Sequence, residues 1–534
     1  MSILSETNLY TVFQRHARAT PEKTLLVVED ETIRYGEFIA ETEAIARALL
    51  ALGVAAGHKV GLILPNSGLW YKLYWAAVRI GAQPVPFDPQ IGEWEMARLL
   101  NLSDVTVCFA ATRYRQNAIL ENLLVARQQV PAMAHVIVVD APDGAPSSDG
   151  APSGDGAPVC DALPFDRFLQ LSPAGAAASG DAPVCPVEET NVLMLACTSG
   201  STGNPKVIVV PHQGFRRSQQ DMADALDFGP DDVMLLGMPL YHQGGFGMGL
   251  QMVLNGGTVF YQPTFEPVKF LKLIERYKIT VLQLTATLAK VILSVPDFEQ
   301  YDLSSVRMAY FAGEVLPMEV ARVFFEKLGI RVINIIGSTE TATMVIWDSQ
   351  CDADVDVNNF RPMPFTAMKI LDEAHQDVAS GDVGTLFIHT DALLMEYYKN
   401  EAETARRLHW WDGLKWFDTG DLGQRCPDGR VRFVGRVKRA IKRGSNLIYP
   451  EEIESFLLTH PDIEAVAVTG QSHDLIGEMV VAHIQPRQGR SFTRRDLIEF
   501  CRGRLAAYKI PDQIVVVEAI PKDIGKVQFK YLRD

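Results

Sequence analysis

Residues 198–206 read Thr-Ser-Gly-Ser-Thr-Gly-Asn-Pro-Lys, a stretch of hydroxyl and glycine residues that ends on Lys206. An apolar run (191–197) precedes it and a β-branched run (207–210) follows, so the pattern predicts a loop between two buried strands. The N–H and O–H groups of such a loop can surround phosphate oxygens, and Lys206 adds a positive charge. The loop is not of the Walker type, because no Ser or Thr follows Lys206 and no helical pattern begins there. The alternative is a flexible polar surface loop.

Two acidic residues follow apolar runs further along the chain. The run 332–336 predicts a buried strand that leads directly into Gly-Ser-Thr-Glu, ending on Glu340. A carboxylate at the carboxyl end of such a strand lies where open α/β sheets bind ligands, and it can hold a hard cation that accompanies phosphates. A helix cap is the alternative for this Ser-Thr-Glu sequence. Asp421, which follows Thr419 and Gly420, can accept two sugar hydroxyls at once.

Basic and apolar groups complete the candidate chemistry. Residues 435–444 carry five basic side chains in an otherwise acidic protein, and a solvated basic face is the alternative to an anion site. Lys526 follows a glycine in a predicted exposed loop near the end of the chain. His242 and Phe246 stand among glycines that would let an apolar ligand approach the backbone, although a satisfied, partly buried histidine is equally compatible.

Composition restricts the class of protein. The chain has 534 residues, a formal net charge of −15 and 47% hydrophobic residues, which indicates a globular protein with more than one domain. The acidic balance argues against nucleic acid as the main partner. Because the sequence shows no apolar segment of signal-peptide or membrane-spanning character, we expect a cytoplasmic protein without a transmembrane segment. Seven cysteines without a Cys-x-x-Cys pair favour reduced thiols.

The elements that must position these groups alternate along the chain. Short apolar strands at 60–64, 105–110 and 136–139 alternate with helical patterns, which is typical of parallel pairing in an α/β body. Residues 141–158 repeat Asp-Gly-Ala-Pro and predict a low-complexity surface insertion. Turn-rich strands after residue 384 predict an antiparallel or barrel-like part. Residues 450–534 alternate between strands and helices and predict a small α+β domain.

In this order, the motifs resemble the adenylate-forming superfamily of acyl-CoA synthetases, peptide-synthetase adenylation domains and luciferases. The resemblance covers nearly the whole chain and rests on five separated motifs. It is greatest to acyl-CoA synthetases. It implies a large N-terminal domain (1–435) of doubly wound α/β subdomains plus a distorted β-barrel, and a small mobile α+β C-terminal domain (436–534) that rotates between two steps of a reaction.

The resemblance also implies a role for each matched residue. Lys526, Glu340, Thr198 and Lys206 would be catalytic, with Glu340 as the residue that holds Mg²⁺. The ATP-binding residues would be Thr198, Ser199, Gly200, Ser201, Thr202, Gly203, Lys206, Gly313, Glu314, Ile336, Gly337, Ser338, Thr339, Glu340, Asp421, Arg436 and Lys526. The substrate pocket would be lined by His242, Phe246, Gly247, Ala312, Gly313, Gly337 and Met344. Lys438 would be the hinge, and Arg439, Arg443 and Gly444 would bind coenzyme A.

The implied reaction uses ATP, Mg²⁺ and coenzyme A. A carboxylate attacks the α-phosphate of ATP to give an acyl-adenylate and pyrophosphate, and a thiol then attacks the acyl carbon. No aspartate stands near His242 to pair with a substrate ammonium, so an uncharged apolar acid is expected. A fatty acid is favoured because glycines 245, 247 and 249 would leave depth for an alkyl chain; an aryl acid is the alternative. A separate carrier protein could replace coenzyme A as the acceptor, and a non-catalytic nucleotide sensor is the remaining hypothesis.

Overall fold

The computed structural model describes residues 8–139, 162–172, 184–186, 188, 191–198, 205–262, 264–313, 316–436, 441–444, 446–448, 450–520, 522–523 and 526–527. At 434–436, 447, 451, 455, 522–523 and 526–527 it describes the backbone alone. The chain separates into two compact units. The first comprises Met1–Cys197, Val209–Gln213 and Gly503–Ala506, and the second comprises the remainder. The predicted insertion at 141–158 lies outside the described residues.

The first unit contains a parallel five-stranded sheet in the order β4-β3-β5-β6-β7. Its strands are β3 (Lys59–Ile63), β4 (Gln83–Pro86), β5 (Val107–Ala111), β6 (His135–Val139) and β7 (Ala162–Pro164). The predicted strands at 60–64, 105–110 and 136–139 and their parallel pairing are confirmed. β5 is buried along its whole length, which explains its continuous apolar sequence, since covered parallel strands lose the alternation of a half-exposed strand.

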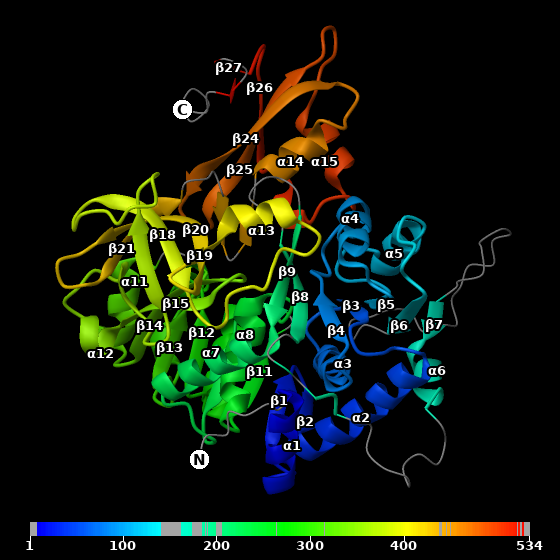
Figure 1. Cartoon of the computed structure of the whole chain (residues 1–534). Helices are drawn as coiled ribbons and strands as arrows, with labels where there is room; N and C mark the ends of the chain where they lie inside the picture. Colours follow the sequence, from blue (N-terminus) through cyan, green and yellow to red (C-terminus); the bar gives the residue numbers. More distant parts are fainter. Residues whose placement is uncertain are drawn as a thin grey trace, which may run out of the picture. The chain divides into compact units, whose positions relative to one another are not determined.

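Helices cover this sheet. They are α2 (Tyr35–Ala51), α3 (Gly68–Arg79), α4 (Glu93–Ser103), α5 (Ile119–Arg127) and α6 (Phe165–Gln170). α2 packs against α3, and α4 packs against α5 (Figure 1). The Ser67 hydroxyl begins α3 by accepting a hydrogen bond of 3.1 Å from the Trp70 N–H. The unit also contains α1 (Tyr10–Ala19) and the hairpin of β1 (Thr24–Val28) and β2 (Glu31–Arg34).

The second unit begins its main sheet with parallel strands in the order β11-β10-β12-β13-β14. Their bounds are β10 (Val233–Leu236), β11 (Thr258–Tyr261), β12 (Val281–Leu284), β13 (Met308–Phe311) and β14 (Arg331–Ser338). The helical segments between and beside them are α7 (His212–Ala225), α8 (Gln243–Leu254), α9 (Pro267–Tyr277), α10 (Ala286–Leu293), η2 (Phe298–Gln300), α11 (Met318–Arg322) and η3 (Val323–Lys327). Figure 1 shows α7 and α8 next to this parallel part.

The sheet continues through antiparallel strands in the order β14-β15-β16-β21-β20-β18-β17, with β19 paired to β20. The added strands are β15 (Ala342–Asp348), β16 (Asn359–Pro362), β17 (Ala367–Leu371), β18 (Val383–His389), β19 (Leu408–Trp411), β20 (Leu414–Arg425) and β21 (Val431–Arg436). Two short helices, α12 (Ser349–Asp352) and α13 (Glu401–Arg407), belong to this part. Strands β18 to β21 correspond to the antiparallel part predicted after residue 384, whereas β15, β16 and β17 precede that part and were not predicted. The β14–β15 pair joins the antiparallel strands to the parallel ones.

A smaller sheet follows near the end of the chain, in the order β23-β22-β25-β24, with β26 parallel to β25. Its elements are β22 (Ile441–Arg443), β23 (Asn446–Ile448), α14 (Pro450–Leu457), β24 (Ile463–His473), β25 (Gly477–Pro486), α15 (Arg494–Cys501), η4 (Ala507–Lys509) and β26 (Gln513–Val516), followed by the pair β27 (Lys522–Asp523) and β28 (Lys526–Val527). The rings of Phe456 and Phe500 stack between α14 and α15. The predicted mixed α/β fold with a smaller α+β C-terminal part is confirmed. The boundary between 435 and 436 stays a prediction.

None of the described helices combines the length and the apolarity needed to cross a membrane.

Candidate active site

Two strands flank the glycine- and hydroxyl-rich segment, as the sequence predicts. β8 (Val192–Thr198) ends at Thr198, and β9 (Lys206–Pro211) begins at Lys206 and is buried along its length. Five of the predicted phosphate-binding residues lie outside the described residues: Ser199, Gly200, Ser201, Thr202 and Gly203. Within this segment the structure therefore describes Thr198 at the start, and Pro205 and the charged Lys206 at the end.

Lys206 is buried, with 7% of its side chain exposed, and its ammonium forms an ion pair with Glu403 of α13. Glu403 also accepts hydrogen bonds from Arg406 at 2.5 and 2.8 Å. Burial alone would raise the pKa of Glu403, but the hydrogen bonds from Arg406 and Lys206 outweigh it and lower this pKa to about 2. Glu403 is therefore a carboxylate at every physiological pH, and it offsets the cost of burying the Lys206 charge.

Glu340 lies in the turn of a β-hairpin, between β14 and β15. The turn is closed by Thr341, whose hydroxyl accepts a hydrogen bond from the Ser338 N–H at 3.2 Å. A Cβ at Gly337 would overlap the carbonyl oxygen of Ala342, so this turn excludes larger residues at 337. Because a strand follows the turn, the alternative that Ser-Thr-Glu caps a helix is wrong.

Tyr397 joins Glu340 to Lys206. Its hydroxyl donates a hydrogen bond of 3.0 Å to Glu340 Oε1, and its ring centroid lies 5.1 Å from Lys206 Nζ. The backbone of the same segment is fixed against β9, because the Tyr398 N–H donates to the Val207 carbonyl at 2.8 Å. Burial and the nearby Glu340 charge raise the pKa of Tyr397, so its hydroxyl remains a donor. The predicted phosphate-binding cation, Lys206, and the predicted metal-binding carboxylate, Glu340, thus contact the same buried tyrosine.

The residues at this position fit a magnesium ion. Tyr397 occupies one oxygen of the Glu340 carboxylate, and the second oxygen has no hydrogen-bond partner within the described part of the chain. Among the described residues, no three acidic, histidine or cysteine side chains gather into a metal-binding group. A hard cation at Glu340 would therefore complete its shell with phosphate and water oxygens, which is how proteins commonly hold Mg²⁺.

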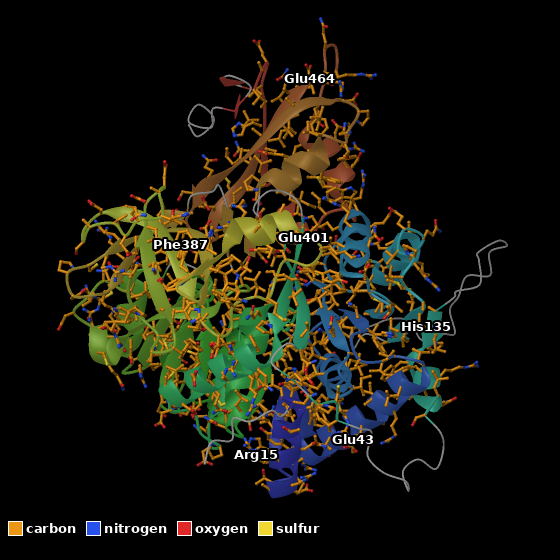
Figure 2. All side chains as sticks on the ribbon, in the orientation of Figure 1. Arg15, Glu43, His135, Phe387, Glu401 and Glu464 are labelled. Carbon is orange, nitrogen blue, oxygen red and sulfur yellow. The ribbon has the colours of Figure 1, made fainter. Side chains whose placement is uncertain are left out.

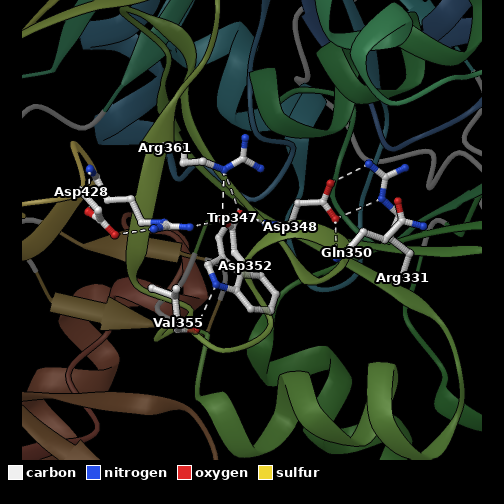
Figure 3. Close-up of polar contacts among 9 residues, drawn as sticks. Arg331, Trp347, Asp348, Gln350, Asp352, Val355, Arg361 and Asp428 are labelled. Carbon is white, nitrogen blue, oxygen red and sulfur yellow. Dashed lines mark hydrogen bonds and ion pairs between the residues drawn. The ribbon is translucent and has the colours of Figure 1, made fainter.

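The base of the β14–β15 hairpin is held by a network of ion pairs (Figure 3). Asp348 receives two hydrogen bonds from Arg331, at 3.1 and 2.7 Å, across the hairpin. Asp352 of α12 receives hydrogen bonds from Arg361 at 3.0 Å and from Arg430 at 2.7 Å, and its side chain is only 1% exposed. These contacts connect the hairpin to β16 and to the turn before β21, so they fix the segment that carries Glu340.

The predicted ribose-binding residue Asp421 and the predicted ATP-binding residue Arg436 are opposite one another in the antiparallel pair β20–β21, where they are in register. Asp421 is buried, and its N–H donates to the Thr419 hydroxyl at 3.0 Å. Gly420 has a positive φ of 69°, and a Cβ there would contact the guanidinium of Arg407 at 2.9 Å. The register thus places the predicted pair side by side, while the Arg436 side chain lies outside the described atoms.

The predicted substrate residues lie at the ends of α8 and of the central strands. His242 precedes α8, whereas Phe246 and Gly247 are buried within it. Ala312 and Gly313 follow β13, Gly337 and the neighbouring Ile336 belong to β14, and Met344 is buried in β15. Thr339 and Ser338 belong to the same hairpin turn as Glu340. Glu314 lies outside the described residues.

The expectation that glycines 245, 247 and 249 leave depth for an alkyl chain is wrong. A Cβ at Gly245 would overlap the Pro239 carbonyl, and one at Gly249 would overlap the Tyr261 hydroxyl. A Cβ at Gly247 would lie 3.1 Å from Gln219 Oε1 and 3.5 Å from the Phe215 ring. These glycines therefore allow α8 to pack closely against the protein itself, and the space beside them is filled by side chains and backbone.

The predicted coenzyme A residues are only partly described. Lys438 and Arg439 lie outside the described residues. Gly444 has a φ of 58° in the turn between β22 and β23. The Arg443 guanidinium binds Asp512 at 2.5 Å and the Tyr508 carbonyl at 2.6 Å, so its described contacts hold the C-terminal sheet together. Lys526 begins β28, and its side chain is not described.

The segment 394–407 contributes Tyr397, Glu403 and Arg407 to the site and was not predicted from the sequence. A local signal was present, because the Asn400 side chain accepts a hydrogen bond from the Glu403 N–H at 3.0 Å and begins α13. That signal predicts a helix but not its partners. The contacts with Lys206 and Glu340 depend on segments far away in the sequence.

The sequence of this chain is similar to that of known CoA ligases and matches two family models. The family model described as AMP-binding enzyme matches residues 13–398, and the model of the AMP-binding enzyme C-terminal domain matches residues 452–525. Indoleacetate–CoA ligase of Aromatoleum aromaticum is 28% identical over 96% of this chain and 95% of its own length. Medium-chain fatty-acid–CoA ligase of Escherichia coli is 27% identical over 99% of this chain and 90% of its own length.

Among solved structures, o-succinylbenzoate CoA synthetase of Bacillus subtilis, as a double mutant bound with a product analogue, superimposes with a TM-score of 0.81. It covers 99% of this chain and 98% of its own at 21% identity, a level that establishes the fold alone. The family model, in contrast, spans the strands, the hairpin and the segment that hold Lys206, Glu340 and Tyr397. The chain belongs to the AMP-binding enzyme family, as the motifs of an adenylate-forming enzyme had indicated.

Proposed function

We propose that this protein is an AMP-forming acid–thiol ligase, which activates an apolar carboxylic acid with ATP and passes the acyl group to coenzyme A. One observation carries the proposal: Lys206 and Glu340, which come from separate motifs, both contact Tyr397. The Lys206 ammonium and the Glu340 oxygen that has no hydrogen-bond partner among the described residues both lie next to Tyr397, and together they suit a polyphosphate with its metal ion. The family and its CoA-ligase members support the same reaction class.

In the first step, an oxygen of the ionised acid bonds to the α-phosphorus of ATP, and the bond to pyrophosphate breaks. Two anions must approach each other, so positive charge is needed where they meet, and we assign this role to Lys526. Lys206 and the hydroxyls of the 198–206 segment would hold the departing phosphates. When bound at Glu340, Mg²⁺ supplies further neutralisation of the phosphate charge. No general base is needed, because the acid arrives ionised.

In the second step, the thiol of coenzyme A bonds to the acyl carbon and AMP leaves. Asp421 would hold the ribose and Arg436 would lie near the ribose or the phosphate, so that both keep the adenylate in place for the two steps. The basic segment 436–444 would attract the phosphates of coenzyme A, with Lys438 as the hinge and Arg439, Arg443 and Gly444 as contacts. Since Arg443 is already paired with Asp512, we expect the other two positions to contribute more.

For the acid, we propose a compact apolar substrate. The glycines of α8 do not support a long alkyl chain, because a Cβ at residue 245, 247 or 249 would meet Pro239, Gln219 or Tyr261 rather than open space. The ring surface that is partly exposed near α8 belongs to His242 and Tyr241, whose centroids lie 4.7 Å apart, whereas Phe246 and Phe215 are buried and stack on each other at 6.2 Å. An aryl or short-chain acid therefore fits better than a long fatty acid, and a medium-chain fatty acid is the second candidate, supported by the relative from Escherichia coli.

A panel of carboxylic acids, assayed for AMP release with and without coenzyme A, tests this function. Aryl, arylalkanoic and medium-chain acids should give AMP release that depends on coenzyme A, and C16 or longer acids should respond least. If a carrier protein is acylated and AMP release does not respond to coenzyme A, the acyl acceptor is a carrier protein and not coenzyme A. If no acid gives AMP release, the proposed ligase activity is wrong, and the remaining interpretation is a nucleotide-binding protein.

Tyr397→Phe is expected to weaken Mg²⁺ binding by about 10–100-fold, because a group that orients a metal-ligating carboxylate commonly contributes this much. The variant removes only the hydroxyl that donates to Glu340 Oε1. Calorimetric titration of ATP at several Mg²⁺ concentrations measures the effect. The matched control is Tyr398→Phe, the same change one residue further along. Equal Mg²⁺ dependence in both variants would contradict the assigned role.

A further inference from the structure

The ion pair between Lys206 and Glu403 ties the phosphate-binding segment to α13. Both side chains are largely buried, with 7% and 11% of their surfaces exposed. We propose that Glu403 is an internal counter-anion, which occupies Lys206 before nucleotide binds and competes with pyrophosphate for it. This inference rests on the proposed function, because it assumes that Lys206 meets the phosphates of ATP.

The surroundings of Glu403 allow such an exchange. Its carboxylate is also held by two hydrogen bonds from Arg406, and the Arg407 Nε lies 3.6 Å from Oε1. If Lys206 turns to a phosphate oxygen, Glu403 remains paired with both arginines. Neither partner is then left as an unpaired buried charge, which is the outcome that makes breaking a buried ion pair costly. The exchange replaces one anion at Lys206 by another.

The pair also has a consequence for product release. Pyrophosphate bound at Lys206 lies next to a carboxylate that is displaced but not removed, so the two anions repel each other. The return of Glu403 to Lys206 then favours departure of pyrophosphate. The negative charge of Glu403 lowers the affinity of this site for phosphates. The reason for such a charge in a phosphate-binding site would be the need to release pyrophosphate, the first product.

The competing explanation is that the pair only anchors β9 to α13. Both explanations predict some loss of stability when Glu403 is replaced, but they differ for phosphate affinity. If Glu403 is only an anchor, its replacement leaves Lys206 less well placed, and pyrophosphate binds more weakly. If Glu403 is a counter-anion, removal of its charge frees Lys206, and pyrophosphate binds more tightly.

The experiment is calorimetric binding of magnesium pyrophosphate and of MgATP to the full chain, with no acid present. Glu403→Gln keeps the side-chain shape and removes the charge, and we expect it to bind pyrophosphate about tenfold more tightly. Glu401→Gln, on the same helix (Figure 2), is the matched control because the Glu401 side chain is exposed, and this variant should bind pyrophosphate as the wild type does. Turnover of Glu403→Gln should fall wherever pyrophosphate release limits the rate.

A double-mutant cycle with Lys206→Ala separates a direct effect from a structural one. If Glu403 acts through Lys206, the gain in pyrophosphate affinity disappears in the Lys206→Ala background. If Glu403→Gln lowers the unfolding midpoint, Glu403→Asp serves as the second variant, and retention of the charge should keep pyrophosphate affinity close to that of the wild type. Affinity in Glu403→Gln that is unchanged or weaker overturns the inference, while the proposed function stands as long as the wild type binds MgATP. If the wild type binds neither ligand, both fail.

Discussion

Lys526→Ala is expected to slow acid-dependent pyrophosphate exchange by about 10²–10³-fold, because removal of one preorganised charge contact with a developing transition state commonly costs that much. The affinity for ATP should change little, since the phosphate, metal and ribose contacts are assigned to other residues. The thiol step, started from a prepared acyl-adenylate, should also be spared if the C-terminal part has moved away by then. Isotope exchange, calorimetry and a single-turnover thiol assay measure the three quantities.

Lys522→Ala is the matched control for this prediction. Lys522 lies on β27, whose partner strand β28 carries Lys526, so the two variants remove the same charge from the same strand pair. The control should retain exchange. If Lys526→Ala and the control exchange pyrophosphate at the same rate, the catalytic assignment of Lys526 is wrong.

Asp352→Ala is expected to lower the free energy of unfolding by about 3 kcal/mol, near the lower end of the range for loss of one partner from a buried ion pair. Asp352 is 1% exposed and neutralises Arg361 and Arg430, and Oδ2 also accepts the Asp348 N–H at 3.1 Å. The estimate is at the lower end because Arg361 is 41% exposed and can recover part of its hydration. Urea unfolding, followed by a probe in the second unit, measures the change.

Asp428→Ala is the control for Asp352. Asp428 also pairs with Arg430, but it is 49% exposed, and such a surface pair contributes little because water and salt screen it. A much larger loss in Asp352→Ala than in Asp428→Ala is the expected result. Because the network holds the base of the hairpin that carries Glu340, Asp352→Ala should also raise the Mg²⁺ concentration needed for ATP binding. Equal stability of the two variants would show that burial of Asp352 does not determine its contribution.

Local patterns were sufficient to predict most elements of the fold. Most residues of β3, β5 and β6 are apolar, and the alternation of strands and helices predicted over 450–534 is present as α14, β24, β25, α15 and β26. α8 is different, because its sequence Gln-Gly-Gly-Phe-Gly-Met-Gly carries four glycines, which weaken a helix. The helix forms because these glycines allow contacts with Pro239, Gln219 and Tyr261, and such contacts are invisible in a local pattern.

The residues of the candidate site that belong to short sequence motifs could be predicted from the sequence. Lys206, Glu340 and Asp421 were found from short stretches with the chemistry of phosphates, metals and sugars. Tyr397 and Glu403 were not found, because neither residue type is unusual in its own segment. Their roles arise from pairing with Glu340 and Lys206, which fold next to them from other parts of the chain. A sequence pattern does not contain that proximity.

The most direct test of the central claim, that Lys206 and Glu340 serve an acid-activating enzyme, is ATP–pyrophosphate exchange across the acid panel at saturating Mg²⁺. We predict exchange that requires an acid, is greatest with a compact apolar one, and is lost when Glu340 is replaced by alanine. Tight binding of MgATP without exchange for any acid would contradict the account and would indicate a nucleotide-binding protein that does not catalyse adenylation.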